Sequence, residues 1–253
     1  MVQGDYPNAK KDCAQVARNA GFQLGIACAA NLRSYTGEAQ QSLALLAQLE
    51  GNVVGSSAVY TSWIQGLMAE ACERLGQWEQ AEAHYRKALS VAPEDNFLLV
   101  AYADLLLDRD RPAEVLTLLR SSSQSDTAFL RLALAKQALH SPDLALYTWV
   151  MAARFEAVLQ RGSDYFGREQ VRFALYLQRN PHAALDLAQR NWQVQRAPWD
   201  ARVLLEAALA ARQPQAAVTV LRFVRETKLE DPIIESIARQ LESQLNGSVA
   251  GVP

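Results

Sequence analysis

The sequence is poor in the residues that build disulfide scaffolds and β-rich folds. It has 253 residues but only 3 cysteines, 12 glycines and 9 prolines. Three cysteines are too few for a disulfide framework, and so few turn-forming residues do not suit a sandwich or barrel of many strands. No stretch approaches the run of about 18 apolar residues that a membrane-spanning helix needs.

An excess of charge of either sign is also lacking, because the net charge is -2 and the isoelectric point is near 6.0. A general nucleic-acid binder would carry a basic excess. Arginines and aromatic residues do alternate between residues 147 and 199, but their helical spacing favours a packed core. We therefore expect no nucleic-acid partner and no membrane span.

Alanine and leucine dominate the composition, with 42 and 35 residues. Both are strong helix formers, whereas valine, isoleucine and threonine, which favour strands, total only 30. Apolar residues recur at helical spacing along the chain. The pattern predicts an all-α protein with helices near 7–19, 22–35, 38–50, 57–75, 78–91, 96–109, 112–122, 127–140, 142–160, 165–179, 181–195, 199–211, 214–227 and 232–245. Short loops and no linker predict one domain over 1–245, followed by a flexible tail at 246–253.

A repeat is visible in these helices. Its clearest unit, residues 62–95, carries Gly76, Trp78, Ala81, Tyr85 and Pro93 at fixed offsets. The pattern resembles the tetratricopeptide repeat of about 34 residues, here of the bacterial type with degenerate outer repeats. The resemblance is strongest over 62–152.

Small residues open the second helix of each unit at intervals of 34, 30, 39 and 33 residues. They are Ala81, Val115, Ala145, Ala184 and Ala217. A large residue follows four positions later, at Tyr85, Leu119 and Trp149, and is expected to fill the gap beside the small one. Ala9 and Cys13 match the start of a second helix that no first helix precedes, so the chain is expected to begin in the middle of a repeat.

The resemblance implies a right-handed superhelix of antiparallel helix pairs whose concave face, lined by first helices, binds a partner protein or peptide. The groove positions carried over from the family are Trp63, Glu70, Glu73, Phe97, Asp104, Asp108, Arg168 and Arg179. Trp63 and Phe97 are expected to be apolar anchors. The four acids would receive basic groups and the two arginines an acidic end. Glu70 and Asp104 stand where chaperone-binding members have lysine and asparagine, so a chaperone-tail receptor is not expected.

Signatures of catalysis and of cofactor or metal binding are missing. No phosphate-binding glycine loop or nucleophile motif is found, and the glycines at 51 and 55 lack the lysine that a phosphate site needs. His84, His140 and His182 are scattered and form no metal-ligand pattern. We expect a non-catalytic scaffold without cofactor or metal.

Cys13 and Cys28 would lie on helices that pack side by side in this architecture. They are expected either to form a disulfide, which implies a periplasmic or otherwise exported protein, or to remain two buried thiols in a cytoplasmic one. The alternative function is a structural, self-associating spacer of a larger, possibly exported protein, joined through the open ends of the solenoid.

Overall fold

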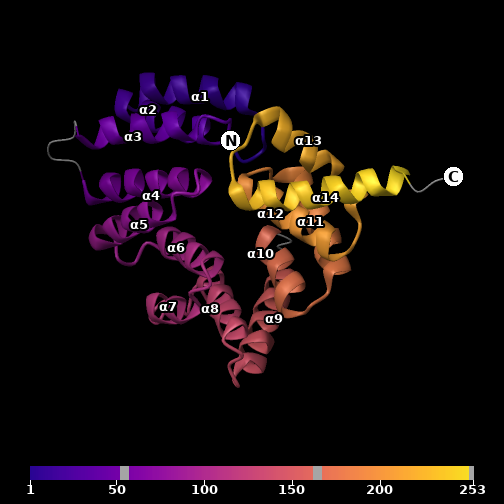
Figure 1. Cartoon of the computed structure of the whole chain (residues 1–253). Helices are drawn as coiled ribbons and strands as arrows, with labels where there is room; N and C mark the ends of the chain where they lie inside the picture. Colours follow the sequence, from indigo (N-terminus) through magenta and orange to yellow (C-terminus); the bar gives the residue numbers. More distant parts are fainter. Residues whose placement is uncertain (52–56, 162–166, 251–253) are drawn as a thin grey trace.

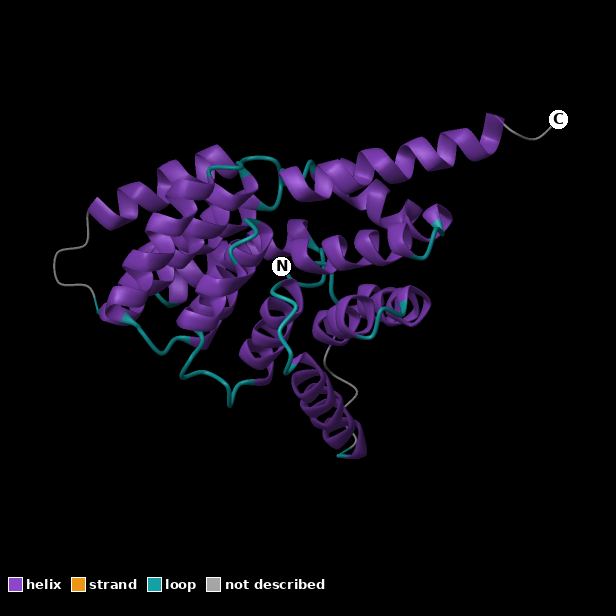
Figure 2. Ribbon diagram, turned by 60° about the horizontal axis from the view of Figure 1, so that its bottom comes forward, coloured by secondary structure: helices purple, strands orange, loops and turns teal. Residues whose placement is uncertain are grey.

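The computed structural model describes residues 1–51, 57–161 and 167–250, and over these residues it consists of helices and loops without a strand (Figure 2). The predicted all-α fold is confirmed. Its α-helices are α1 (Tyr6–Asn19), α2 (Phe22–Ser34), α3 (Ala39–Gly51), α4 (Ala58–Arg74), α5 (Trp78–Val91), α6 (Asn96–Asp108), α7 (Pro112–Leu118), α8 (Asp126–Ala138), α9 (Leu144–Gln160), α10 (Gly167–Arg172), α11 (Pro181–Val194), α12 (Pro198–Ala210), α13 (Val218–Thr227) and α14 (Pro232–Ala250).

The helices follow one another as packed pairs. α2 packs on α3, α4 on α5, α6 on α7, α8 on α9, α10 on α11, and α12 on α13. Helix α1 precedes the first pair and α14 follows the last. Polar side chains cap several helix starts: the Asp5, Ser57, Asp95, Ser125 and Asn180 side chains each accept a backbone N–H of the first turn. Such caps satisfy N–H groups that have no partner inside the helix.

The turn inside each pair has one residue in the left-handed conformation. These residues are Gly37, Gly76, Asp110, His140, Arg179 and Arg212, with φ between 50° and 77°. The turn is closed by a hydrogen bond across it, such as Gln77 N to Cys72 O at 2.8 Å. From Gly76 onward, the turn residues recur at the same 34, 30, 39 and 33 residue intervals as the small residues.

Arg212→Gly should stabilise the protein. The exposed Arg212 holds φ at 56°, a conformation that strains a residue with a Cβ. Relief of that strain, less the extra entropy of glycine in the unfolded chain, should raise the free energy of unfolding by about 0.5–1 kcal/mol. Urea denaturation followed by circular dichroism measures it. The control Arg222→Gly, at an exposed position inside α13, should lower stability by about 1 kcal/mol. Equal losses in both variants would contradict the strain argument.

The predicted small residues mostly lie at the close contacts between helices. Ala81, Val115, Ala184 and Ala217 are completely buried. The prediction was wrong for Ala145, which is exposed, and for Trp149, which is 68% exposed instead of filling a gap. The turn before α9 is longer, since α9 begins four residues after His140 and α5 two after Gly76. The register shifts, and α9 buries Met151 and Phe155.

Three segments differ from the predicted helices. Helix α10 passes into a π-helical turn, η1 (Phe173–Leu177), and α13 is preceded by a 3-10 turn, η2 (Pro214–Ala217). Of the predicted helix over 165–179, residues 165 and 166 lie outside the described residues. The tail was expected from residue 246, where Asn246 and Gly247 have weak helix propensity, but α14 continues to Ala250. Residues 251–253 lie outside the described part.

The pairs curve into a nearly closed ring. In Figure 1 the chain descends from α1–α3 through α4–α8, turns at α9, and returns through α10–α12 so that α13 and α14 lie beside the N-terminus. The first helices of the pairs face the centre, where residues of α4, α6, α8, α10 and α12 line a common cavity.

Candidate functional site: a cavity at the centre of the ring

Contacts between the first and last parts of the chain close the ring. The Arg196 N–H donates to the Val2 carbonyl at 2.6 Å, and the Ala39 N–H donates to the Glu230 carboxylate at 2.9 Å. Phe223 packs against Tyr6 with their ring centroids 5.9 Å apart. The surfaces that an open solenoid would leave at its two ends are thus partly buried against each other.

The closure encloses a cavity of about 480 Å³. Its wall includes the aromatic side chains Tyr35, Trp78, Tyr85, Phe97 and Trp199. The remaining wall is rich in charge, with six acidic residues and four arginines: Glu70, Glu73, Asp104, Asp108, Glu169 and Asp231, and Arg74, Arg131, Arg168 and Arg202. What the cavity can bind therefore depends on which of these charges are already paired.

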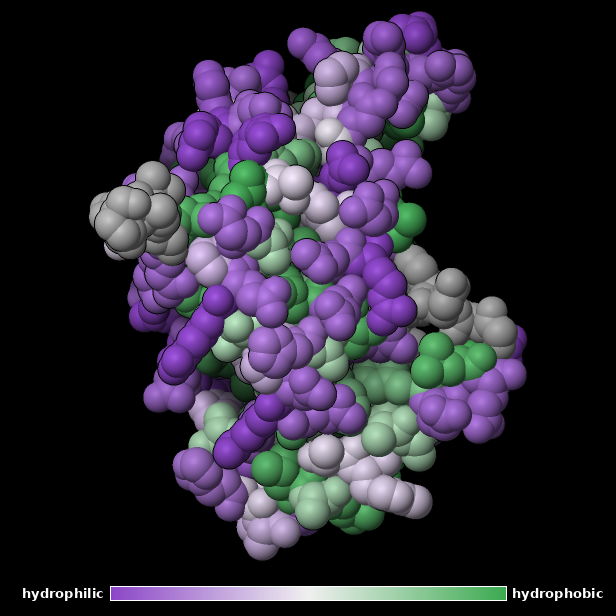
Figure 3. Space-filling view, turned by 90° about the vertical axis from the view of Figure 1, so that its right-hand side faces the viewer, coloured by the Kyte–Doolittle hydropathy of each residue, from purple (hydrophilic) through white to green (hydrophobic). Residues whose placement is uncertain are grey.

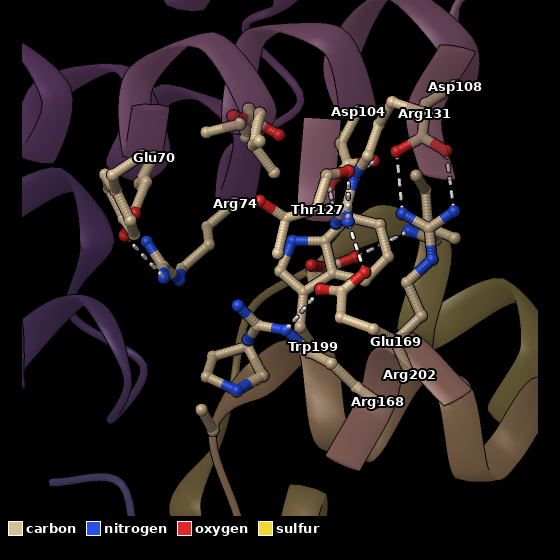
Figure 4. A pocket seen from close by; sticks show the side chains of 18 of the residues that line it. Glu70, Arg74, Asp104, Asp108, Thr127, Arg131, Arg168, Glu169, Trp199 and Arg202 are labelled. Atoms are coloured by element: carbon tan, nitrogen blue, oxygen red, sulfur yellow. Dashed lines mark hydrogen bonds and ion pairs between the residues drawn. The ribbon is translucent and has the colours of Figure 1, made fainter. Parts of the chain in front are cut away.

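Arg131 is the centre of the buried charge network (Figure 4). Its side chain is 1% exposed and reaches from α8 to Asp104 of α6, with Nε–Oδ1 and Nη2–Oδ2 distances of 3.0 and 2.7 Å. It also donates to the Glu169 carboxylate and, at 3.2 Å, to the Thr127 carbonyl. Such paired, fork-like hydrogen bonds fix the two carboxylates in position.

Two further arginines cross the ring from its second half. Arg172 pairs with Asp104 at 2.8 Å, and Arg202 of α12 holds both oxygens of Asp108 at 2.6 Å. Both guanidinium groups also lie against the Trp199 ring, with centroid distances of 4.8 and 4.3 Å. Asp108 and Arg202 are 94 residues apart in the sequence, so these pairs connect the two halves of the ring.

These pairs connect two segments of opposite charge in the sequence. Residues 59–123 contain 6 basic and 10 acidic residues, whereas residues 154–212 contain 9 basic and 6 acidic residues. Such segregation would suit a groove that orients a dipolar partner. In the structure, Asp104 and Asp108 of α6 are neutralised by Arg172 and Arg202 from the second half of the ring.

Burial and pairing shift the protonation equilibria of these acids in opposite directions. Burial alone would raise the pKa of Asp104, but Arg131 and Arg172 hold it well below the usual range. Among the described residues, no arginine forms an ion pair with Glu73. Burial raises the pKa of Glu73 to about 8, although a hydrogen bond from the Tyr85 hydroxyl opposes the shift. Burial therefore favours the neutral form of the Glu73 carboxyl.

Six of the predicted groove residues line the cavity: Glu70, Glu73, Phe97, Asp104, Asp108 and Arg168. Trp63 and Arg179 do not line it, and Arg179 occupies the left-handed turn before α11. The expectation that the acids await basic groups does not fit their surroundings. Asp104 and Asp108 are paired with arginines, Glu70 pairs with Arg74 at 3.3 Å, and burial raises the pKa of Glu73.

Sequence reasoning missed Arg131, Glu169, Arg172, Trp199 and Arg202. One signal was present, since Arg131 interrupts an apolar run of α8, and a charge on an inward helical position calls for a buried partner. The partners could not be assigned, because they come from helices whose closeness depends on the curvature of the whole ring.

The structure joins Cys13 of α1 to Cys28 of α2 in a disulfide, with a Cα–Cα distance of 5.3 Å. Cys72 is a buried free thiol, and burial raises its pKa to about 11. Over the described residues, no group of three or more His, Cys, Asp or Glu is placed to hold a metal ion. Within the same part of the chain, none of the helices has the length and hydrophobicity to span a bilayer.

Comparisons with known proteins agree with this architecture. Residues 62–105 match the model of the tetratricopeptide repeat family. The fold is similar to the crystal structure of a tetratricopeptide repeat protein from Parabacteroides merdae ATCC 43184, with a TM-score of 0.52 over 94% of this chain and 93% of that one. The two sequences are 13% identical, so this likeness concerns the fold alone. No curated protein matches the chain.

The fold defines an α-helical repeat solenoid that closes around a charged cavity. Within that class, the chain contains a recognisable tetratricopeptide repeat over residues 62–105, which comprise most of α4, all of α5 and most of α6.

Proposed function

We propose that the chain is a non-catalytic interaction module that binds a partner protein or peptide on its concave face. Tetratricopeptide repeats generally mediate protein–protein interaction. The observation that carries the proposal is a pair of exposed aromatic residues at equivalent positions of neighbouring inner helices. Trp63 of α4 and Phe97 of α6 are 34 residues apart and 39% and 58% exposed.

The surroundings of these residues suit a partner-binding surface. Val59, one turn before Trp63, is also largely exposed, so the inner helices α4 and α6 present three exposed apolar side chains. Large exposed aromatic residues often supply most of the binding energy at protein interfaces. The charged network behind them is already paired, so apolar contacts rather than attraction of basic groups provide affinity.

Affinity capture with matched variants tests this proposal. Wild type, Trp63→Ala, Phe97→Ala and Trp149→Ala are used as baits, and bound proteins are identified by mass spectrometry. A true partner should bind the Trp63→Ala and Phe97→Ala baits about tenfold or more weakly than it binds wild type. It should bind the Trp149→Ala bait as tightly as wild type. Circular dichroism checks that all four remain folded. A partner equally retained by the three variants would contradict the concave-face assignment.

A self-associating structural role is the second candidate. The outer surface of α9 exposes Leu146, Trp149 and Leu159, and hydrophobic side chains gather in the lower part of the molecule in Figure 3. Such a surface favours association between copies. Light scattering distinguishes the two roles, because association through α9 would raise the mass with concentration in wild type and not in the Trp149→Ala variant.

We also propose an oxidising compartment, such as a bacterial periplasm, as the location. The Cys13–Cys28 disulfide supports it, since structural disulfides persist mainly outside the cytosol.

A further inference from the structure

The central cavity has the dimensions of a small-molecule site. Its volume of about 480 Å³ falls within the range of about 300–1,000 Å³ that is usual for ligand pockets. Phe97, Trp199 and Tyr35 provide flat apolar walls. Because the ring closes around it, this space suits a compact ligand, whereas Trp63 and Val59 of the proposed partner surface lie outside the cavity.

Arginine contributes unused hydrogen-bond donors to the wall. Among the acids, Asp104, Asp108 and Glu169 are bound by arginines, and the Asp231 carboxylate accepts the Ile233 and Ile234 N–H groups at 3.0 Å. Arg74, which comes from the end of α4, is only 8% exposed. It forms one ion pair, to Glu70 at 3.3 Å, and its Nε and Nη1 atoms have no hydrogen-bond partner among the described residues.

A second guanidinium group approaches from the opposite wall. Arg168 of α10 is 34% exposed, and its ion pair with Glu169 is long, at 3.5 Å. Glu169 is already held by Arg131, so Arg168 can turn toward a ligand without leaving that carboxylate unpaired. Figure 4 shows the Arg74 and Arg168 guanidinium groups entering the same part of the cavity from two sides.

The Tyr35 ring fixes Arg74 in place. The Arg74 guanidinium carbon lies 4.6 Å from the ring centroid, in a cation–π contact. A guanidinium group that is oriented in advance loses little entropy when it binds a planar anion. Glu70 and Asp231 also face this region, so a ligand with a single negative charge fits better than one with two.

We propose that the cavity binds a small monocarboxylate with a flat apolar body. Its carboxylate lies between Arg74 and Arg168, and its body lies against Trp199 and Phe97. Arginine matches a carboxylate through paired N–H donors, and the aromatic walls provide the apolar contact. Phe97 belongs to both proposed sites, but the carboxylate anchors Arg74 and Arg168 take no part in the proposed partner binding, so this proposal does not rest on it.

Isothermal titration calorimetry with 4-bromophenylacetate tests the proposal, and the neutral 4-bromophenylacetamide is the matched probe. Wild type should bind the acid at least about tenfold more tightly than the amide. Arg168→Gln should remove that preference, and Arg190→Gln, at an exposed position of α11, should retain it. Arg168 is chosen because the buried Arg74 also contributes to folding.

A crystal soaked with 4-bromophenylacetate locates the ligand through the anomalous signal of bromine. The expected site has the carboxylate between the two guanidinium groups and the bromine toward the aromatic wall. The proposal is overturned by equal affinities for acid and amide, by an Arg168→Gln variant that binds like wild type, or by bromine outside the cavity. Absence of binding by the acid up to about 10 mM overturns it as well.

Discussion

Replacing Arg131 with alanine should lower the free energy of unfolding by about 3–5 kcal/mol, the largest loss that we expect from a single substitution. In the part of the chain that the structure describes, the variant leaves Asp104 paired with Arg172 alone and Glu169 with only its 3.5 Å contact to Arg168, although both carboxylates are largely buried. A buried charge that loses its main partner costs more than the ion pair contributes, because it has already lost its water. Urea denaturation followed by far-ultraviolet circular dichroism measures the loss.

The matched control is Arg225→Ala. Arg225 also forms an ion pair with an acid, Glu242 at 2.9 Å, but it is 75% exposed. Removal of a solvent-exposed pair should change stability by less than about 1 kcal/mol. Similar losses for Arg131→Ala and Arg225→Ala would show that the central network contributes no more than a surface contact does.

Removal of the Cys13–Cys28 disulfide should cost about 3 kcal/mol. The two cysteines are 15 residues apart, and a crosslink that closes a loop of this length restricts the unfolded chain by about that amount. The double variant Cys13→Ala, Cys28→Ala should therefore unfold at a lower urea concentration than wild type.

A reducing agent provides the internal control for this prediction. Dithiothreitol should lower the stability of wild type toward that of the double variant and leave the double variant unchanged. Alkylation of the unfolded wild-type protein without reductant should modify one thiol, that of Cys72. Three modified thiols, together with equal stability of the two proteins, would contradict the disulfide.

The helices and their pairing could be predicted because they depend on local patterns. Ala81, Gly76 and their equivalents mark contacts and turns that each unit forms with its neighbour. The failure at Ala145 has a local cause, since two additional turn residues before α9 rotate its buried face. The spacing of the family's repeat predicts where the turn before α9 lies, but it does not predict how many residues the turn contains.

The cavity was only partly predictable. Glu70, Phe97 and Asp104 lie on inner helices, as the repeat pattern implies. Their pairing state depends on Arg172 and Arg202, which approach only because small rotations accumulate over several units. The accumulated rotation cannot be calculated from a single sequence. Asp104 and Asp108, which arginines neutralise inside the ring, were therefore interpreted as free binding groups.

The closed ring has a consequence for the way this protein folds. An open solenoid frays from its ends, because each terminal repeat contacts only one neighbour. Here the hydrogen bond between Ala39 and Glu230 joins residues 191 positions apart, and Tyr6 packs on Phe223. Such contacts raise the contact order, which slows folding. They also give each terminal unit a second neighbour, so the two ends are stabilised together and unfold as a cooperative unit instead of one repeat at a time.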